Sequence, residues 1–313
     1  MTPRRVLVIR LSALGDFVLS FGPFAAIRAH HPDAEITLLT TAPYAGLARM
    51  APWFDRVEID ARPSWWNVPG LGRLWRQLQG FDMVYDLQTS GRSSRYFTLA
   101  GRPLWSGIAP GCRFAQSDPA RETMHTIERQ RDQLAIAGIA AFPVPDLGWL
   151  TSAVVPELPP RFVLLVPGAA PSRPAKRWPV QNFAELAVYV ADRDAVPVVI
   201  GGKGEAGLAA EILAQCPSAI DLTGQTAMAD LFAIAARATL AVGNDTGPMH
   251  IAASVGCPSV VLFSEDSEPT MTAPRGPGGA WPVVLREKLL ADLTVGRVVE
   301  ALRHAAYKAP EIL

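Results

Sequence analysis

The chain has 313 residues, of which 49% are hydrophobic and 19% charged, and its formal net charge is zero. This length exceeds one typical domain, so we expect two domains of roughly 150 residues each. A net charge of zero gives no overall field toward nucleic acid, and no nucleic-acid partner is expected. The cysteines, Cys112, Cys216 and Cys257, are odd in number and far apart. They indicate neither a disulfide framework nor a zinc site, and they fit a reducing cytosol.

The first 24 residues look like a signal peptide, because Arg4 and Arg5 precede an apolar run. Arg10 and Asp16 interrupt that run, so residues 6–9 are better explained as a first β-strand. No segment approaches the roughly 18–20 consecutive apolar residues that a membrane span needs. We therefore expect a cytoplasmic protein, and any membrane contact would be peripheral.

Short apolar runs alternate with helical patterns through the first half of the chain. Polar loops follow the first strand, at 11–16, and the fourth strand, at 88–94. The patterns predict strands at 5–10, 36–40, 57–59, 82–87 and 104–108, and helices at 17–30, 44–50 and 122–138.

Residues 140–160 contain five prolines and are the expected linker. The same alternation begins again after this linker, with a basic loop after its first strand and a glycine turn after its second. The predicted strands are 161–166, 196–200, 220–222, 238–242 and 259–263, and the predicted helices are 180–193, 205–215, 228–236, 248–255 and 293–307.

Strands that alternate with helices predict an α/β fold, in which each parallel sheet is covered on both faces. Ligands in such sheets bind at the carboxyl ends of the strands, where all of these loops lie. We place the two domains at residues 1–150 and 151–313, facing each other across a cleft. The last helix, near 293–307, could cross back onto the first domain.

The most informative stretch is VGNDTGPMH, at residues 242–250. Pro248 suits the first turn of a helix, and Gly243 and Gly247 permit a sharp turn with exposed amides. Free N–H groups and the helix dipole at such a start attract phosphate. Because Asp245 adds a carboxylate beside this anion site, the pattern suggests a ligand with both hydroxyls and phosphates, such as a sugar nucleotide.

His250, one turn further along, is by itself more often a packed helix residue than a functional one. Its position so close to Asp245 and Thr246 makes a functional role more credible. No second histidine or acidic cluster with ligand spacing lies nearby, so neither a metal nor a cofactor is expected.

Three further residues are candidates, each with an ordinary alternative. Asp16 could be a general base or simply a carboxylate favoured in a first helical turn, which is the commoner case. Lys176, in the basic stretch PSRPAKRW, could neutralise a diphosphate leaving group or belong to a solvated loop. Glu205 could accept ribose hydroxyls or only begin a helix, because GGKGE is not an established nucleotide fingerprint.

Residues 62–76 form an unusual segment with three of the eight tryptophans and with Arg62, Arg73 and Arg76. Three interpretations stay open: a flap over an anionic acceptor, a membrane-interface patch, or a tryptophan-rich edge of the core. The last is the most common explanation for such a segment.

Taken together, five stretches resemble glycosyltransferase family 9, the ADP-heptose:lipopolysaccharide heptosyltransferases. The similarity runs nearly from end to end, and the fifth stretch is the most specific. They are LSALGD at 11–16, YDLQ at 85–88, HTIER at 125–129, KRWP at 176–179 and NDTGPMHIAASVGCP at 244–258.

This resemblance implies a GT-B fold, with the donor bound by the C-terminal Rossmann-like domain and the acceptor by the N-terminal one. It implies transfer with inversion and without a metal ion, at the inner face of the inner membrane. Asp16 would deprotonate the acceptor hydroxyl, and Lys176 would meet the donor phosphates. The implied donor-binding residues are Glu205, Asp245, Thr246, Gly247, Pro248, Met249 and His250, and the implied acceptor-binding residues are Arg62, Gln88, Arg92, His125 and Arg129.

Two stretches depart from the family pattern. SEDSEP at 264–269 replaces a glycine and a Pro-Thr/Ser-Asp-Pro turn near the donor sugar, and TSGRS at 89–93 replaces a GLLKS-like run near the acceptor. Because of these two departures, the sequence defines the reaction class better than it defines the donor and acceptor sugars. The expected partners are a nucleotide-sugar donor, by this resemblance ADP-heptose, and a lipid-linked sugar acceptor of the lipopolysaccharide core.

Two other functions compete with transfer. A sugar-nucleotide epimerase can share this architecture but needs further acid and base groups around the donor sugar. A non-catalytic nucleotide-sugar or glycan-binding module needs neither Asp16 nor Lys176, and both are present.

Overall fold

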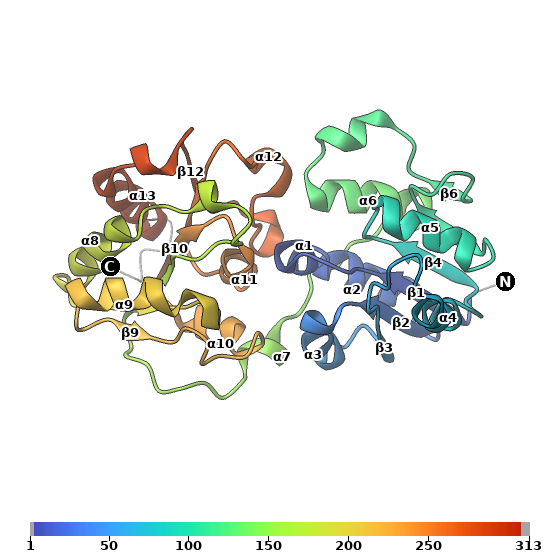
Figure 1. The fold of residues 1–313 in the computed structure, drawn as a ribbon, viewed down its shortest axis with the longest axis horizontal. Coiled ribbons are helices and arrows are strands. Elements are labelled where there is room, and N and C mark those ends of the chain that lie inside the picture. The colour runs from blue at the N-terminus through green and yellow to red at the C-terminus, as the bar shows by residue number, and fades with distance from the viewer. Residues whose placement is uncertain (1–2, 308–313) are drawn as a thin grey trace. The chain divides into compact units, whose positions relative to one another are not determined.

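A computed structural model describes residues 3–307 of the chain. It divides into two compact units, Met1–Pro145 and Asp146–Leu313, each built around one parallel sheet of six strands (Figure 1). Among the described residues no helix combines the length and apolar character required to span a bilayer. The two parallel sheets establish the predicted α/β class.

The first unit has the strand order β3-β2-β1-β4-β5-β6, with every neighbouring pair parallel. The interior of β1 is wholly buried, as expected of a central strand covered on both faces. The strands are β1 (Arg5–Ile9), β2 (Glu35–Thr40), β3 (Arg56–Ile59), β4 (Met83–Asp86), β5 (Leu104–Gly107) and β6 (Phe114–Ala115). The helices are α1 (Leu14–Leu19), α2 (Phe21–His30), α3 (Ala42–Met50), α4 (Val68–Gln77), α5 (Gly91–Leu99) and α6 (Thr126–Ile136).

The second unit repeats this plan with the order β12-β11-β10-β7-β8-β9. Its neighbouring strands are again parallel. The strands are β7 (Phe162–Val166), β8 (Val196–Val199), β9 (Ile220–Asp221), β10 (Leu240–Asn244), β11 (Ser259–Phe263) and β12 (Val283–Arg286). The helices are α7 (Gly148–Thr151), α8 (Val180–Ala191), α9 (Ala206–Gln215), α10 (Asp230–Arg237), α11 (Gly247–Ser254), α12 (Pro269–Thr272) and α13 (Val295–Tyr307).

In both sheets the order of the strands reverses next to the first strand of the unit. The reversal falls between β1 and β4 in the first sheet and between β7 and β10 in the second. Loops that leave the carboxyl ends of such a pair run in opposite directions and leave space for a ligand. The topology therefore predicts one ligand-binding edge in each unit.

Several boundaries differ from the sequence predictions. The single helix predicted at 17–30 is two helices, α1 and α2, which meet at Ser20, and Asp16 belongs to α1. The predicted loop at 88–94 contains the first turn of α5, where Ser90 Oγ accepts a hydrogen bond from Ser93 N at 3.1 Å. This turn was missed because its residues, GRSS, carry no apolar periodicity.

Other elements were missed because they are short, namely β6, α12 and β12. The helix predicted at 122–138 begins only at Thr126, after a 3₁₀ turn at Pro119–Thr123. The last helix is α13, and its buried face, which includes Val298 and Leu302, belongs to the core of the second unit. That face packs on β10, β11 and β12 rather than serving a core of the first domain.

Candidate active site

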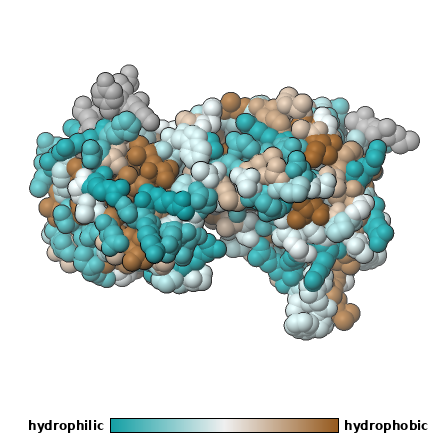
Figure 2. Space-filling model, turned by 90° about the horizontal axis from the view of Figure 1, so that it is seen from above, coloured by the Kyte–Doolittle hydropathy of each residue, from teal (hydrophilic) through white to brown (hydrophobic). Residues whose placement is uncertain are grey.

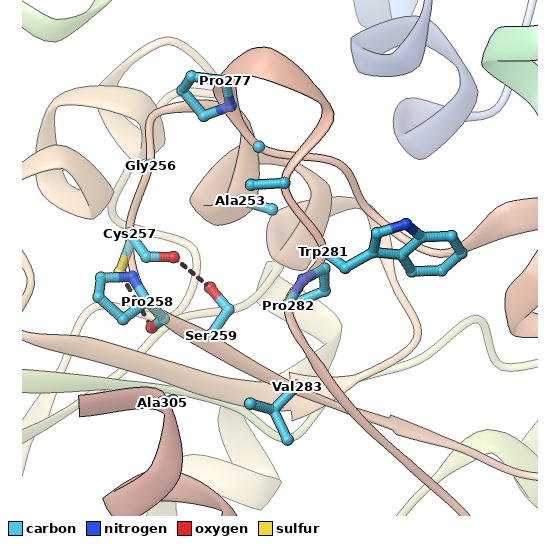
Figure 3. Close-up of a pocket in the computed structure, with 12 residues that line it drawn as sticks. Ala253, Gly256, Cys257, Pro258, Ser259, Pro277, Trp281, Pro282, Val283 and Ala305 are labelled. Atoms are coloured by element: carbon cyan, nitrogen blue, oxygen red, sulfur yellow. Dashed lines mark hydrogen bonds between the residues drawn. The ribbon is translucent and has the colours of Figure 1, made fainter. Parts of the chain in front are cut away.

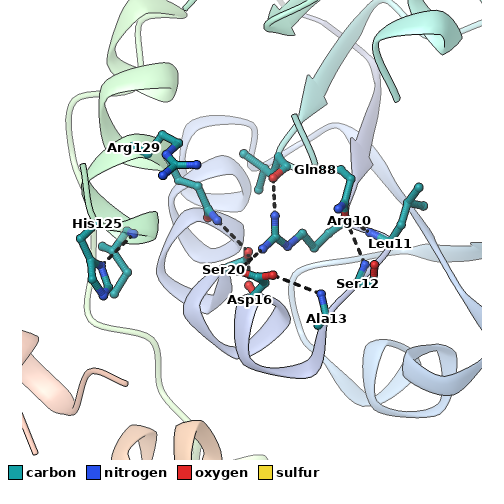
Figure 4. Close-up of polar contacts among 12 residues, drawn as sticks. Arg10, Leu11, Ser12, Ala13, Asp16, Ser20, Gln88, His125 and Arg129 are labelled. Atoms are coloured by element: carbon teal, nitrogen blue, oxygen red, sulfur yellow. Dashed lines mark hydrogen bonds and ion pairs between the residues drawn. The ribbon is translucent and has the colours of Figure 1, made fainter. Parts of the chain in front are cut away.

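One candidate site lies at the carboxyl ends of β1 and β4, and we call it the first-unit site. Asp16 stands there in the first turn of α1, and its side chain is 39% exposed. Its Oδ1 lies 3.1 Å from Nη2 of Arg10, and its Oδ2 accepts a hydrogen bond from Ala13 N at 3.2 Å (Figure 4). The carboxylate is therefore fixed in place while part of it still faces solvent.

Arg10 is the buried partner of this pair. Its side chain is 5% exposed, and Nη1 donates to the carbonyl oxygen of Leu87 at 2.5 Å. Burial lowers the pKa of Arg10, and the charge of Asp16 opposes that shift. The other nearby acid, Asp86, is fully buried, and desolvation raises its pKa to about 7. Because Asp86 is only partly ionised near neutral pH, Asp16 is the principal counter-charge of Arg10.

Gln88 organises the loop between β1 and α1. Its Oε1 accepts hydrogen bonds from Leu11 N at 2.8 Å and from Ser12 N at 3.1 Å. The sequence predicted Gln88 as an acceptor contact. Its carbonyl oxygen is committed to the protein backbone, so only its NH2 group is left to meet a ligand.

Two predicted arginines approach the same edge from later elements. Arg62 has a φ of 49°, in the left-handed region that few residues other than glycine adopt, and its Nη2 donates to Ser12 Oγ at 2.6 Å. Arg92, in the first turn of α5, donates from Nε to Tyr96 Oη at 2.6 Å and from Nη2 to the carbonyl oxygen of Pro63 at 2.7 Å. The structure thus ties Arg62 directly to the loop that leads into α1 and Asp16, and ties Arg92 to the segment around Arg62.

His125 and Arg129 lie at the start of α6. His125 Nδ1 accepts a hydrogen bond from Ile127 N at 3.2 Å and caps the helix. Arg129 donates from Nη2 to the carbonyl oxygen of Met124 at 3.1 Å. Burial lowers the pKa of Arg129, and the negative charge of Asp16 is among the influences that raise it. Arg129 therefore stands within electrostatic reach of Asp16, on the same side as His125 (Figure 4).

The second-unit site lies at the equivalent place, the carboxyl ends of β7 and β10. Lys176 closes a 3₁₀ turn, Pro174–Lys176, and Asp245 directly follows β10. Lys176 Nζ lies 2.6 Å from Asp245 Oδ2, and the two side chains are only 13% and 7% exposed. Two candidates that the sequence treated separately are one ion pair in the structure.

Asn244 holds this arrangement together and was not among the predicted site residues. It is fully buried, its Oδ1 accepts from Trp178 N at 3.0 Å, and its Nδ2 donates to the carbonyl oxygen of Pro167 at 2.8 Å. Both contacts pin the loop of Lys176 to the end of β10. An asparagine beside an aspartate at a strand end is equally typical of an ordinary turn, so no local pattern distinguishes its role.

Two glycines of the second unit allow neighbouring segments to approach closely around a small hollow. A methyl group at Gly243 would lie 2.4 Å from Cβ of Val166 on the neighbouring strand, and one at Gly168 would lie 1.6 Å from Oε1 of Glu205. The hollow has a volume of about 110 Å³ and is lined by Glu205, Thr246 and residues of the loop after β7, Gly168 included. The structure therefore places Glu205 beside Thr246 at the start of α11.

The start of α11 is open on this side. Thr246 occupies the N-cap position without a side-chain cap, and its buried Oγ1 has no hydrogen-bond partner within residues 3–307. Gly247 is the first helical residue, and Pro248 lines the hollow. Met249, however, is 0% exposed and packs in the core, and its contact with a donor stays a prediction. His250 is also largely buried, at 6% exposure.

A larger pocket of about 220 Å³ lies elsewhere in the second unit (Figure 3). It is lined by Pro258 and Ser259 at the start of β11, by Trp281 and by Val283 at the start of β12. These are the amino ends of the strands, and none of the predicted site residues is there. The size of a pocket therefore does not identify the candidate site, whereas a position at the carboxyl ends of the parallel strands does.

Residues 71–280 match the family model of glycosyltransferase family 9 (heptosyltransferase). The chain belongs to glycosyltransferase family 9. It is 34% identical over 303 residues to lipopolysaccharide heptosyltransferase 2 of Salmonella typhimurium, covering 86% of this chain and 85% of that protein. It is also 24% identical over 298 residues to the lipopolysaccharide core heptosyltransferase OpsX of Haemophilus influenzae, covering 87% and 82% of the two chains. This membership makes the protein a glycosyltransferase.

Solved structures share the fold of this family 9 chain. ADP-heptose lipopolysaccharide heptosyltransferase II of Escherichia coli superposes with a TM-score of 0.75 at 23% identity, covering 98% and 99% of the chains. The E. coli heptosyltransferase WaaC with ADP gives 0.77 at 18% identity, covering 96% and 100%. These likenesses confirm the predicted GT-B fold. A UDP-GlcNAc 2-epimerase of Methanocaldococcus jannaschii also shares it, with a TM-score of 0.58 at 12% identity, so fold alone does not choose the reaction.

In the acidic turn at 264–269, which departs from the family pattern, one of the three acids has a structural role. Glu268 caps α12 through an Oε1 that accepts from Thr270 N at 3.4 Å, and its Oε2 lies 2.8 Å from Nη1 of Arg286. Glu265 and Asp266 are the exposed acids of this family 9 chain at that turn. Across residues 3–307 no group of three or more histidine, cysteine, aspartate or glutamate side chains is arranged to hold a metal ion.

Proposed function

We propose that the protein transfers a heptose from ADP-heptose to a sugar of the lipopolysaccharide core, with inversion at the anomeric carbon and without a metal ion. The observation that carries this proposal is the combination of family 9 membership with the uncapped start of α11 at the second-unit site. The Salmonella and Haemophilus relatives are named as lipopolysaccharide heptosyltransferases, which supports both the sugar and the acceptor.

The second-unit site would hold the donor. The open start of α11 and the ammonium group of Lys176 suit a diphosphate, because backbone N–H groups and a cation both favour negative charge. Glu205 presents a carboxylate to the same hollow and suits ribose hydroxyls. Met249 and His250 also belong to the proposed donor site, and both are largely buried within α11.

The first-unit site would supply the base. In the reaction the acceptor hydroxyl oxygen forms a bond to the anomeric carbon, and Asp16 takes the hydroxyl proton. The bond from the anomeric carbon to the diphosphate oxygen breaks at the same time. Its electron pair leaves on the nucleoside diphosphate, whose charge Lys176 and the amides of α11 stabilise. Arg62, Arg92 and Arg129 would bind negatively charged groups of the anionic acceptor.

We infer further that the enzyme works at the cytoplasmic face of the inner membrane, where a lipid-linked acceptor is presented. Its contact with that membrane would be peripheral, since no helix of residues 3–307 can span it.

A direct assay tests the reaction class. The purified protein is incubated with ADP-heptose or another nucleotide sugar, with and without a lipid acceptor that carries Kdo. We expect release of nucleoside diphosphate only when the acceptor is present. An isomeric nucleotide sugar formed without acceptor would instead identify an epimerase, and binding without any turnover would identify a non-catalytic module.

Replacing the base tests the role of Asp16. Asp16→Asn should lower turnover by at least about a hundredfold, because the amide cannot accept the hydroxyl proton. Donor affinity, measured by calorimetry, should be unchanged, since Asp16 belongs to the first-unit site. Asp82→Asn, at an exposed acid that binds only backbone N–H groups at the other end of the sheet, is the matched control. Turnover near the wild-type rate in Asp16→Asn would remove Asp16 from this role.

The ion pair of Lys176 requires a two-step test. Lys176→Ala should weaken donor binding by roughly tenfold to a hundredfold, the range for losing a charged hydrogen bond, and should also slow transfer. This change also leaves Asp245 unpaired, and its charge would repel a diphosphate. The double variant Lys176→Met/Asp245→Asn removes both charges. Donor binding should stay weak in it, whereas recovery to the wild-type affinity would mean that Lys176 only neutralises Asp245.

Gly168 gives a test of Glu205 that leaves the carboxylate present. In Gly168→Ala the new methyl group would overlap Oε1 of Glu205, and the side chain must swing away. We expect donor affinity to fall by roughly tenfold while the free energy of unfolding changes by less than about 1 kcal/mol, because only a flexible side chain moves. Glu205→Ala should cause a similar loss, and the double variant should lose no more. Additive losses would show that the two residues act separately.

A further inference from the structure

The residues from 61 to 117 carry a concentrated positive charge. This segment holds seven arginines and only two acids, Asp82 and Asp86, and therefore a net charge of +5 in a chain whose total is zero. Asp86 is fully buried, and Asp82 is used at the amino end of β4, where Oδ2 accepts from Arg4 N and Arg5 N at 2.8 and 2.9 Å. Neither acid neutralises the arginines of the helices.

Those arginines are exposed along two neighbouring helices, α4 and α5. Arg73 and Arg76 are exposed on α4, Arg95 is exposed on α5, and Arg102 is exposed just after it. We call the exposed residues of these two helices and their flanking turns the α4–α5 face.

Contacts at both ends hold the two helices side by side. The guanidinium groups of Arg92 and Arg95 each lie 5.2 Å from the ring of Trp65, just before α4. At the other end, Gln79 Nε2 donates to the carbonyl oxygen of Leu99 at 3.2 Å. The α4–α5 face is therefore one continuous surface rather than two separate patches.

Large apolar side chains project from the same face. Trp66 is 84% exposed, Val68 74%, Trp75 48% and, at the start of β5, Leu104 49%. Val68 and Trp75 are seven residues apart and lie on one side of α4, with the exposed Gly72 between them. Figure 2 shows a narrow projection from the first unit at its lower right, where α4 points toward the viewer in Figure 1.

The core does not need these side chains. α4 is anchored by its opposite side, through Leu74 and Leu78, each 1% exposed. Asn67 caps its start by accepting from Gly70 N at 3.0 Å. Trp65 packs against the core and Trp105 of β5 belongs to it, whereas the exposed Trp66 and Trp75 are not part of that cluster.

We propose that the α4–α5 face docks on the surface of an anionic phospholipid bilayer. Indole rings at the level of the headgroups and arginines against their phosphates are the combination that such a surface selects. The face includes Arg62, and the half-buried Arg92 contacts Pro63 next to it, both at the carboxyl ends of the strands, the same edge of the sheet that carries Asp16. Docking there would present the first-unit site to a lipid-linked substrate, although binding itself needs neither donor nor acceptor.

Flotation of the full chain with vesicles tests this proposal. The wild type should bind vesicles of equal parts phosphatidylglycerol and phosphatidylcholine and should not bind phosphatidylcholine alone. Raised salt should release it, because the attraction is screened. Arg73→Gln and Arg76→Gln should each lower the partition coefficient by about fivefold. Arg161→Gln and Arg237→Gln, at exposed arginines of the second unit, are the matched controls and should not change it.

The exposed apolar side chains of the α4–α5 face are tested by separate variants. Trp66→Ser and Trp75→Ser should lower binding, whereas Trp281→Ser, at a second-unit tryptophan that is 46% exposed, should not. Gly72→Leu should strengthen binding, because it adds apolar surface between Val68 and Trp75 where no atom lies within 4 Å. Gly46→Leu, in an equally open and exposed place on α3, should leave binding unchanged.

Wild-type protein that stays free of anionic vesicles, or variants of the α4–α5 face that bind as the wild type does, would exclude this surface as a membrane contact. Binding of a short single-stranded oligonucleotide to the face, without any vesicle binding, would assign the face to nucleic acid instead. None of these results depends on transfer of a sugar, so failure here leaves the proposed function untouched and separately testable with a water-soluble acceptor.

Discussion

Two side-chain amides hold the backbone at the points on which both candidate sites depend. Where the strand order reverses, the diverging loops leave N–H and C=O groups that no sheet neighbour can satisfy. Gln88 accepts from two amides of the loop that leads to Asp16. Asn244 accepts from one amide of the loop of Lys176 and donates to a carbonyl oxygen of the same loop. In each unit a side-chain amide at or just beyond the end of the strand across the reversal fixes the loop that leads to the charged group.

The two charged groups are then presented in opposite ways. In the first unit the cation is buried and the carboxylate is accessible, with Arg10 at 5% and Asp16 at 39% exposure. In the second unit both members of the pair are withdrawn, and Lys176, at 13%, is slightly more open than Asp245, at 7%. An accessible carboxylate with a fixed orientation suits proton abstraction, and a cation braced by a buried acid suits an incoming anion. The two ion pairs therefore differ in exposure: Asp16 is the accessible member of the first pair, whereas both members of the second pair are largely buried.

The sequence was sufficient for the α/β class and for most central strands, because their apolar runs are continuous and short. It failed where structure depends on polar contacts between distant segments. The Asn244 contacts join residues 66 and 77 positions apart, and no local pattern marks them. α5 was missed for a related reason, since its first turn is fixed by Ser90 and Ser93 rather than by apolar spacing. The motif at 242–250 correctly predicted the helix start, but it could not separate Met249, which packs inward, from Pro248, which lines the hollow.

Composition misled in one further respect. A net charge of zero excludes a field around the whole molecule, but it says nothing about how charge is distributed along the chain. Residues 61–117 carry +5, so the other residues together carry the opposite charge. The fold then gathers Arg73, Arg76 and Arg95 on neighbouring helices, while Asp86 is removed to the interior. Because a Debye length in physiological salt is about 8 Å, a surface responds to the charges that lie within a few side chains of it. A molecule with no net charge can therefore present a strongly basic face to an anionic surface.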